Sequence, residues 1–532
     1  MRKLTLLLIS LIAFTSAFAT EKGKATLCVN KPLASQMTGE NTIYVIKRNI
    51  NLKGKTIVVP KGCVLEFKKG KLRNGTIIGN GTRIDAEKRQ IFENIEIDPK
   101  GTWENHRGYP EWFGASDNPS VDSKMPIQRA IDVADTCILS QKYYTSFDTP
   151  TGRGDSQSLC AIAIKGTIMI GEPRNRIVID AKHSNTEKTS VFWVGDNVTV
   201  DGVNIEYVNE NHSGWTGTQA GVYRVQGGNV TIQNTSLRGA MAAWINLEGR
   251  PGRENYVIKN NYVHDCDCGL ISQGNQHQPG EVYSIKLLVE GNTIEKEKQR
   301  HSEFVSFWGG CVKPGRVYYT DVTIKNNRFS GGYQGGCIVG HPDRTGLKKV
   351  VITDNQFNDC GACSFYFADG MVYERNFVTG STFIERQIKG TMGSYPDLCF
   401  YNCTNCVVDD CSCFGLTVVD CKNLRIGKLK QTLCLESDDQ YINQKDYVTN
   451  FMGISAKNST VAIDELVISP YMDENKTSEN CKYYVHKGEN STINVKTMTS
   501  SIPVLVAKNK FKASKMNFTK GDKKSMYINL VK

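Results

Sequence analysis

Val322-Thr-Ile-Lys-Asn-Asn-Arg-Phe329 is an alternating apolar run that is closed by small polar residues and followed by another apolar position. Nearly the same phrase occurs seven times between Val198 and Asp410. Because successive side chains of a strand point to opposite faces, each copy predicts a strand, a sharp corner and a second strand. The other copies begin at Val198, Val230, Tyr256, Leu287, Val350 and Met371, and a Cys-rich variant begins at Cys406.

The spacing of these copies indicates how the strands are arranged. The last strand residue recurs after 32, 26, 31, 35, 28, 21 and 35 residues, counted from Val200 to Val408. A spacing that varies above a minimum is typical of a solenoid whose coils carry insertions, and no leucine-rich pattern recurs. The sequence therefore predicts an all-β fold, a single-stranded right-handed parallel β-helix with coils about 4.8 Å apart. Asn at the corners tolerates left-handed backbone, and stacked amides are expected to hydrogen-bond between coils.

The N-terminus has the features of a secretory signal peptide. Arg2 and Lys3 precede the apolar run Leu4 to Phe14, and Ala17-Phe18-Ala19 offers a cleavage point after Ala19. No later segment reaches about 18 consecutive apolar residues, so no integral membrane segment is expected. We therefore expect a secreted or periplasmic protein.

Composition divides the rest of the chain into three parts. Residues 20–110 contain short strand-like runs separated by Gly turns and predict a small N-terminal β module. Residues 111–435 hold the regular coils, and residues 436–532 repeat the rhythm less regularly. Between Pro126 and Asp135, apolar residues recur at helical spacing, which predicts a short amphipathic helix that caps the open end of the solenoid.

Charge and cysteine content narrow the possible partners. The formal charge is +11 over 532 residues, a mild excess that is compatible with an acidic glycan, and no basic run interleaved with aromatic residues indicates nucleic acid. Eighteen Cys in an exported chain suggest disulfides, but several fall in strand-like runs. Buried thiols, one or more disulfides and a zinc site all remain open. Scattered Asp residues are compatible with Ca²⁺, although no consecutive acidic pattern indicates it, and no other metal or cofactor is predicted.

A family resemblance supports the same fold. Trp112-Phe-Gly-Ala115, the following Asp122, the helix around Ile127–Ile131 and the coils after it resemble the pectate-lyase-like superfamily over roughly residues 105–430. The resemblance implies a β-helix that acts on polysaccharides, as lyases, polygalacturonase-type hydrolases and phage tailspikes do. The catalytic motifs of these enzymes do not transfer, because Gly340-His341 is followed by Pro342, and Trp244-Ile-Asn246 is only partly similar to a lyase motif.

A second set of apolar runs follows the corners and predicts a sheet with a shallow groove that suits a polymer. Glycosidic hydrolysis needs two carboxyl groups, whereas elimination needs a base and cations that neutralise a uronate. The candidate catalytic residues are His341, Asp343, Arg344, Glu303, Asp369, Glu385 and Arg386. The candidate substrate-binding residues are Arg224, Trp244, His301, Trp308, Tyr366 and Lys389, in which flat aromatic faces complement sugar rings.

The sequence thus predicts an exported carbohydrate-active β-helix protein that binds a polysaccharide and cleaves it as a lyase or a glycoside hydrolase. The alternative is a non-catalytic glycan-binding, adhesin or tailspike-like β-helix. The oligomeric state and the identity of the glycan stay open.

Overall fold

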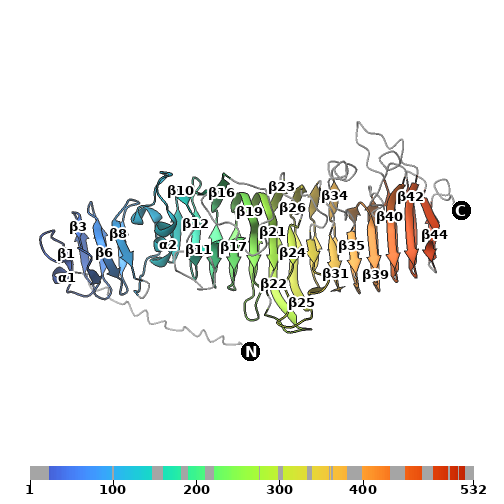
Figure 1. Cartoon of the computed structure of the whole chain (residues 1–532), viewed down its shortest axis with the longest axis horizontal. Helices are drawn as coiled ribbons and strands as arrows, with labels where there is room; N and C mark the ends of the chain where they lie inside the picture. Colours follow the sequence, from blue (N-terminus) through green and yellow to red (C-terminus); the bar gives the residue numbers. More distant parts are fainter. Residues whose placement is uncertain are drawn as a thin grey trace, which may run out of the picture. The chain divides into compact units, whose positions relative to one another are not determined.

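The computed structural model describes residues 23–98, 101–146, 160–180, 190–209, 221–272, 274, 276–296, 303–331, 338–358, 360, 363–379, 398–431, 450–469, 483–500, 504–512 and 515–521. The chain divides into two compact units, Met1–Asn105 and His106–Lys532, which are considered separately (Figure 1). This division lies close to the end of the N-terminal module that the sequence predicts at residue 110.

The first unit is built from short parallel strands. One sheet has the order β1-β2-β5-β7, and a second has the order β3-β6-β4 with β8 paired to β6. All these pairs are parallel, so the chain winds in coils with a short strand on each side. The elements are β1 (Lys24–Thr26), α1 (Leu33–Gln36), β2 (Ile43–Ile46), β3 (Ile50–Asn51), β4 (Thr56–Val58), β5 (Val64–Phe67), β6 (Leu72–Ile78), β7 (Arg83–Ala86) and β8 (Phe92–Ile97).

The second unit is a three-sided parallel β-helix, and this confirms the predicted fold (Figure 1). Each regular coil contributes one strand to each of three ladders, as β14, β15 and β16 do in sequence order. The second ladder consists of β9 (Thr136–Leu139), β12 (Ile168–Gly171), β15 (Val198–Asp201), β18 (Val230–Gln233), β20 (Tyr256–Lys259), β22 (Val282–Glu290), β25 (Val317–Lys325), β28 (Thr345–Lys348), β29 (Val351–Thr353), β32 (Ala368–Asp369), β33 (Val372–Glu374), β36 (Val407–Asp409), β37 (Cys411–Cys413), β39 (Leu424–Gln431), β41 (Thr460–Ile468), β43 (Thr492–Ser500) and β45 (Lys515–Gly521).

The first and third ladders share two long strands, β19 and β21, and therefore form one continuous sheet of twenty strands. These strands are β10 (Lys142–Thr145), β11 (Cys160–Ile164), β13 (Arg176–Asp180), β14 (Ser190–Val194), β16 (Asn204–Val208), β17 (Gly221–Val225), β19 (Ser236–Leu247), β21 (Tyr262–Ser272), β23 (Thr293–Lys296), β24 (Val305–Phe307), β26 (Arg328–Gly331), β27 (Ile338–Gly340), β30 (Gln356–Asn358), β31 (Ser364–Tyr366), β34 (Phe377–Thr379), β35 (Leu398–Tyr401), β38 (Leu416–Val419), β40 (Asn450–Lys457), β42 (Tyr483–Glu489) and β44 (Val504–Lys512). The strands after residue 436 extend the same ladders.

The corner between the second and third ladders holds the asparagine stack that the repeated phrase predicts. Five buried asparagines stack on successive coils: Asn261, Asn292, Asn327, Asn355 and Asn376. From Asn261 to Asn355, each side-chain amide donates to the Oδ1 of the next asparagine at 2.9 Å. The residue before each one adopts a left-handed backbone, for example Asn260 at φ 53° and Asn326 at φ 55°. The expected coil-to-coil hydrogen bonds are thus confirmed.

The predicted helix caps the first coils of the second unit. Helix α2 (Lys124–Asp132) buries Ile127, Ala130 and Ile131 and contacts β9, β11 and the 3₁₀ helix η1 (Pro110–Phe113). Gln128 accepts from Ala163 N at 2.8 Å and donates to Ala163 O at 3.0 Å. The Gln128 amide therefore hydrogen-bonds to backbone N–H and C=O groups of β11. A further coil of the solenoid would otherwise be needed to pair with these groups.

The described cysteines are mostly interior residues, since twelve of fourteen are buried. The thiols of Cys403, Cys406 and Cys421 donate to backbone carbonyls, for example from Cys421 Sγ to Val419 O at 3.2 Å. This favours the interpretation of these residues as buried thiols that fill a narrow interior.

Candidate functional site

The first ladder aligns side chains on the side of its strands opposite the solenoid interior. Its register aligns Trp193, Arg224, Asn246, Ile271 and Ser306 on successive coils and, beyond the coil of β27, Ser364. Asn246, Ile271 and Ser306 of this row are nevertheless buried. Strand alternation directs the intervening residues, such as Phe307, into the core, where Phe307 is fully buried. A second row lies two residues further along each strand and includes Gln226, Glu248, Trp308, His341 and Tyr366.

Glu303 is the acidic centre of this face. Its Oε2 accepts from Ser306 Oγ at 2.6 Å and from the indole Nε1 of Trp308 at 3.1 Å. Its backbone carbonyl accepts from the buried Lys296 Nζ at 3.1 Å. Ser306 and Trp308 thus fix Oε2 of the carboxylate, and neither of them donates to Oε1. The arrangement holds a carboxylate in one orientation, as binding or acid–base chemistry requires.

His341 lies on the next coil against Trp308, and the two rings meet edge to face with centroids 5.1 Å apart. Its Nδ1 accepts from Asp343 N at 3.1 Å, so the neutral ring carries its proton on Nε2. Burial lowers the pKa of His341 and the charge of Arg344 lowers it further, whereas Asp343 and Glu303 raise it. The net shift is downward, which favours a neutral imidazole that donates from Nε2.

Aromatic side chains continue this row beyond His341. Tyr366 and Tyr401 are paired in register on β31 and β35. Their rings stack with centroids 4.9 Å apart and an interplanar angle of 10°. Both side chains are half-buried. Together with the half-buried Trp308, they offer flat apolar surfaces of the kind that sugar rings contact.

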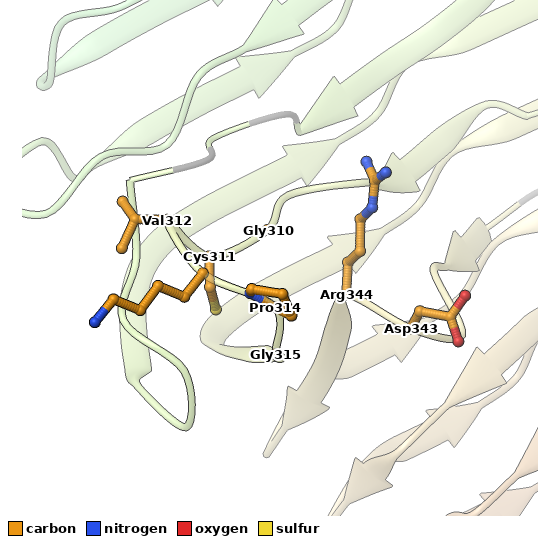
Figure 2. A pocket seen from close by; sticks show the side chains of 8 residues that line it. Gly310, Cys311, Val312, Pro314, Gly315, Asp343 and Arg344 are labelled. Carbon is orange, nitrogen blue, oxygen red and sulfur yellow. The ribbon is translucent and has the colours of Figure 1, made fainter.

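Asp343 and Arg344 lie beside this cluster rather than inside it. With the loop 310–315 they line an open cavity of about 550 Å³. Figure 2 shows their side chains directed away from each other, with Cys311 and Pro314 in the same cavity wall. Both side chains are exposed. The structure therefore brings Glu303, Trp308 and His341 together directly, and Arg344 acts on His341 through its charge.

A second cluster, on the coils of Glu248 and Arg224, lies two to three coils before Ser306, which is about 10–14 Å along the solenoid. Glu248 accepts from Arg224 Nε at 2.7 Å, from Gln226 Nε2 at 2.8 Å and from Arg250 at 2.8 Å. Gln226 in turn accepts from Trp193 Nε1 at 2.7 Å. Of these residues, the sequence predicted Arg224 as a substrate-binding residue and Trp193 as a sugar-stacking surface. Glu248 and Gln226 could have been found by counting two positions beyond each outward residue of the first ladder.

Two predicted residues do not join this cluster. Trp244 is fully buried, so it offers no stacking surface. The register of β19 is continuous from Ala243 to Leu247, so Trp244 lies on the same side of the strand as Asn246 and is covered there. Asp369 ends β32 in the second ladder, where it accepts from Thr404 at 2.9 Å and Asn405 at 3.0 Å. These hydrogen bonds lower its pKa and give it a role in the corner.

The remaining predicted residues, His301, Glu385, Arg386 and Lys389, lie outside the described residues. Within the described ranges, no group of three or more His, Cys, Asp and Glu side chains is arranged to hold a metal ion. In the same part of the chain, no helix combines the length and apolar character needed to cross a membrane.

Comparisons with known proteins agree with the observed fold. A family model described as the right handed beta helix region matches residues 189–383. No curated protein matches the chain. The pectate-lyase-like resemblance is borne out at the level of the right-handed parallel β-helix.

Several solved structures are similar at 12–13% sequence identity. The catalytic unit of a GH87 α-1,3-glucanase from Streptomyces thermodiastaticus is 12% identical, with a TM-score of 0.42 over 81% of this chain and 71% of that one. The surface protein and adhesin PfbA of Streptococcus pneumoniae is 13% identical, with a TM-score of 0.33 over 78% and 98%. Tailspike protein 2 of the Escherichia coli O157:H7 bacteriophage CAB120 is 12% identical, with a TM-score of 0.34. The match covers 78% of this chain but only 46% of the tailspike, so this chain spans less than half of the tailspike's length. Likenesses this distant carry no argument about activity, so the function is argued from the residues.

Proposed function

We propose that this protein is exported, binds a polysaccharide across the first ladder and cleaves it at Glu303. The observation that supports this proposal is the cluster in which Trp308 and Ser306 hold the Glu303 carboxylate, one coil away from His341. A fixed carboxylate, a neutral imidazole and half-buried aromatic rings on one face are the groups that sugar binding and cleavage use.

Each group has a defined role in this proposal. Trp308 and the Tyr366–Tyr401 pair stack against sugar rings and position the chain along the coils. Glu303 acts as the carboxylate that accepts a proton or attacks, through Oε1. His341 donates from Nε2 to a sugar oxygen, since Asp343 N occupies its Nδ1. Arg344 supplies a cation beside this site for a substrate carboxylate.

The experiment compares Glu303→Gln with the parent protein on acidic and neutral polysaccharides. Gln keeps the size of Glu303 and removes its charge, so we expect cleavage to fall by about 100-fold or more. Unsaturated products that absorb in the ultraviolet identify elimination, whereas new reducing ends without that absorbance identify hydrolysis. Glu374→Gln, on β33 of the second ladder, is the matched control. Unchanged cleavage in Glu303→Gln would overturn the assignment of Glu303.

A non-catalytic glycan-binding protein is the second candidate, and the stacked tyrosines favour it specifically. Their two flat faces suit sugar rings without any catalytic group. If Tyr366→Ala and Tyr401→Ala abolish glycan binding while the parent protein cleaves none of the glycans that it binds, this candidate replaces the first. The N-terminal residue of the mature protein, read by mass spectrometry after expression, tests the expected cut after Ala19.

A further inference from the structure

The positive charge of this protein is concentrated in its first unit. Residues 1–105 contain eighteen Lys and Arg against nine Asp and Glu, whereas residues 106–532 contain forty-seven against forty-five. The first unit therefore carries +9 of the formal +11, and +7 remains when residues 1–19 are left out. The mild excess of positive charge over the whole chain therefore has two parts. The first unit is strongly positive for its size, and the second unit is close to neutral.

Much of this charge lies at one corner of the coils. The corner follows β2, β5 and β7, whose last residues Ile46, Phe67 and Ala86 are in register. It ends before β3, β6 and β8. The three corner segments, 47–49, 68–71 and 87–91, therefore stack on consecutive coils. They contain seven basic residues and a single acid, Glu87. We call these seven residues the corner stripe: Lys47, Arg48, Lys68, Lys69, Lys71, Lys88 and Arg89.

Contacts between the segments show that the stripe is continuous. A Cβ at Gly70 would lie 2.3 Å from Arg48 O, so the first two corners are in close contact. Arg89 donates to Gly70 O at 3.4 Å, and Lys71 Nζ donates to Gln90 Oε1 at 2.7 Å, which joins the second corner to the third. With coils about 4.8 Å apart, the stripe extends about 10 Å along the solenoid.

Part of the stripe is neutralised internally. Lys68 pairs with Glu66 at 2.6 Å, and Lys71 lies 3.7 Å from Glu93. The side chains of Lys47, Arg48, Lys69 and Lys88 are exposed. Like charges held side by side repel one another, so an ordered anion that lies along them is favoured by charge complementarity.

We propose that the corner stripe binds an acidic polysaccharide, which is a function separate from the cluster at Glu303. A linear arrangement of cations matches a linear polyanion whose carboxylates pair with Lys and Arg. The corner segments, all of which the structure describes, contain no aromatic residue on which nucleic-acid bases could stack. Their one large apolar residue, Ile91, is fully buried and cannot anchor in a lipid surface. These features favour a uronate-type glycan over nucleic acid or membrane.

The test uses the full-length protein and the combined variant Lys47→Gln, Arg48→Gln, Lys69→Gln and Lys88→Gln. Binding to polygalacturonate, dextran, phosphatidylglycerol vesicles and duplex DNA is measured at several salt concentrations. We expect salt-sensitive binding to polygalacturonate, no binding to neutral dextran, and a loss of affinity of about tenfold in the variant. The matched control removes four exposed lysines of the second unit: Lys165→Gln, Lys422→Gln, Lys428→Gln and Lys430→Gln.

A further variant keeps the proposal testable if the fourfold variant folds poorly. Glu87→Gln removes the single acid of the corner segments and is expected to strengthen polygalacturonate binding by about two- to threefold. The fourfold variant should keep the parent's turnover rate at saturating substrate, so a loss of stripe binding and a loss of cleavage at Glu303 are told apart. Equal losses in the stripe and control variants would overturn the corner stripe as the binding surface. Binding to DNA or vesicles without binding to polygalacturonate would overturn the acidic polysaccharide as its ligand.

Discussion

The indole Nε1 of Trp308 donates to Glu303 Oε2 at 3.1 Å, and the two residues, five positions apart, flank strand β24 of the first ladder. The same indole packs against His341 of the next coil. Trp308 thereby joins a carboxylate and an imidazole that lie far apart in the sequence. It is both a candidate sugar-stacking surface and the group that orients the candidate catalytic acid.

Replacing Trp308 by Phe separates these two roles. Phe keeps an aromatic face but cannot donate to Glu303, and a hydrogen bond to a charged group contributes about 1.5–3 kcal/mol. We expect the turnover rate to fall by about tenfold or more, with a smaller change in substrate affinity. Steady-state kinetics on the polysaccharide that the parent protein cleaves give both values. Trp193→Phe loses its donation to Gln226, away from Glu303, and should change turnover little.

Replacing Arg344 by Gln should change the pH dependence of His341. The positive charge of Arg344 lowers the pKa of His341 in addition to the effect of burial. Its removal therefore raises this pKa, and the pH below which the ring becomes protonated moves upward. Because Asp343 N donates to Nδ1 only when that nitrogen is unprotonated, activity should be lost on protonation. NMR titration of the imidazole and the acid limb of the pH–rate profile should move together, and Arg328→Gln on β26 should move neither. A downward movement in Arg344→Gln would contradict this prediction.

Replacing Asn327 by Ala should destabilise the second unit. Asn327 Oδ1 accepts from both Asn292 N and Asn292 Nδ2 at 2.9 Å, and its amide donates to Val289 O at 3.0 Å. Removal leaves buried groups without these partners, at a cost of about 2–5 kcal/mol. Thermal unfolding followed by circular dichroism measures the loss. Asn326→Gly is the control, because Asn326 is exposed at φ 55°, a conformation that Gly adopts freely. Equal losses in the two variants would show that the buried amide stack is not the source of the stability.

Glu66 should make the stability of the first unit depend on pH. Hydrogen bonds from Lys24 and Lys68 lower the pKa of Glu66. A carboxyl group whose pKa is lower in the folded state stabilises that state above its unfolded pKa. This contribution is lost as the pH falls through the folded pKa. Glu66→Gln should therefore be less stable than the parent protein at neutral pH, and the difference should vanish in acid. Thermal unfolding across a pH series measures this, with the exposed Glu40→Gln as the reference variant.

The sequence predicted the coils well because their determinants are local. Alternation within Val322–Phe329 sets which side chains face the core, and the Asn pair at its corner sets the turn and the buried amide stack. The capping helix was predicted from apolar spacing, but the role of Gln128 was not, since it depends on the edge of a strand 35 residues away. Similarly, alternation placed Trp244 on the outer side of its strand but did not show that this position is fully buried.

The candidate site was predicted only in part, because it depends on alignment between coils. Glu303, Trp308, His341 and Tyr366 were selected individually, whereas their arrangement follows from the register of β24, β27, β31 and β35. Glu248 and Tyr401 were missed because their importance comes from neighbours on adjacent coils.

The sequence by itself determined that this chain winds into a parallel β-helix with asparagine corners, because strand alternation and left-handed turns are encoded within a few consecutive residues. The tertiary structure decided which side chains meet on the first ladder and which basic residues gather along the corner stripe. Both depend on how coils of unequal length stack. An insertion changes the distance along the sequence between two coils without changing the spacing of about 4.8 Å between them.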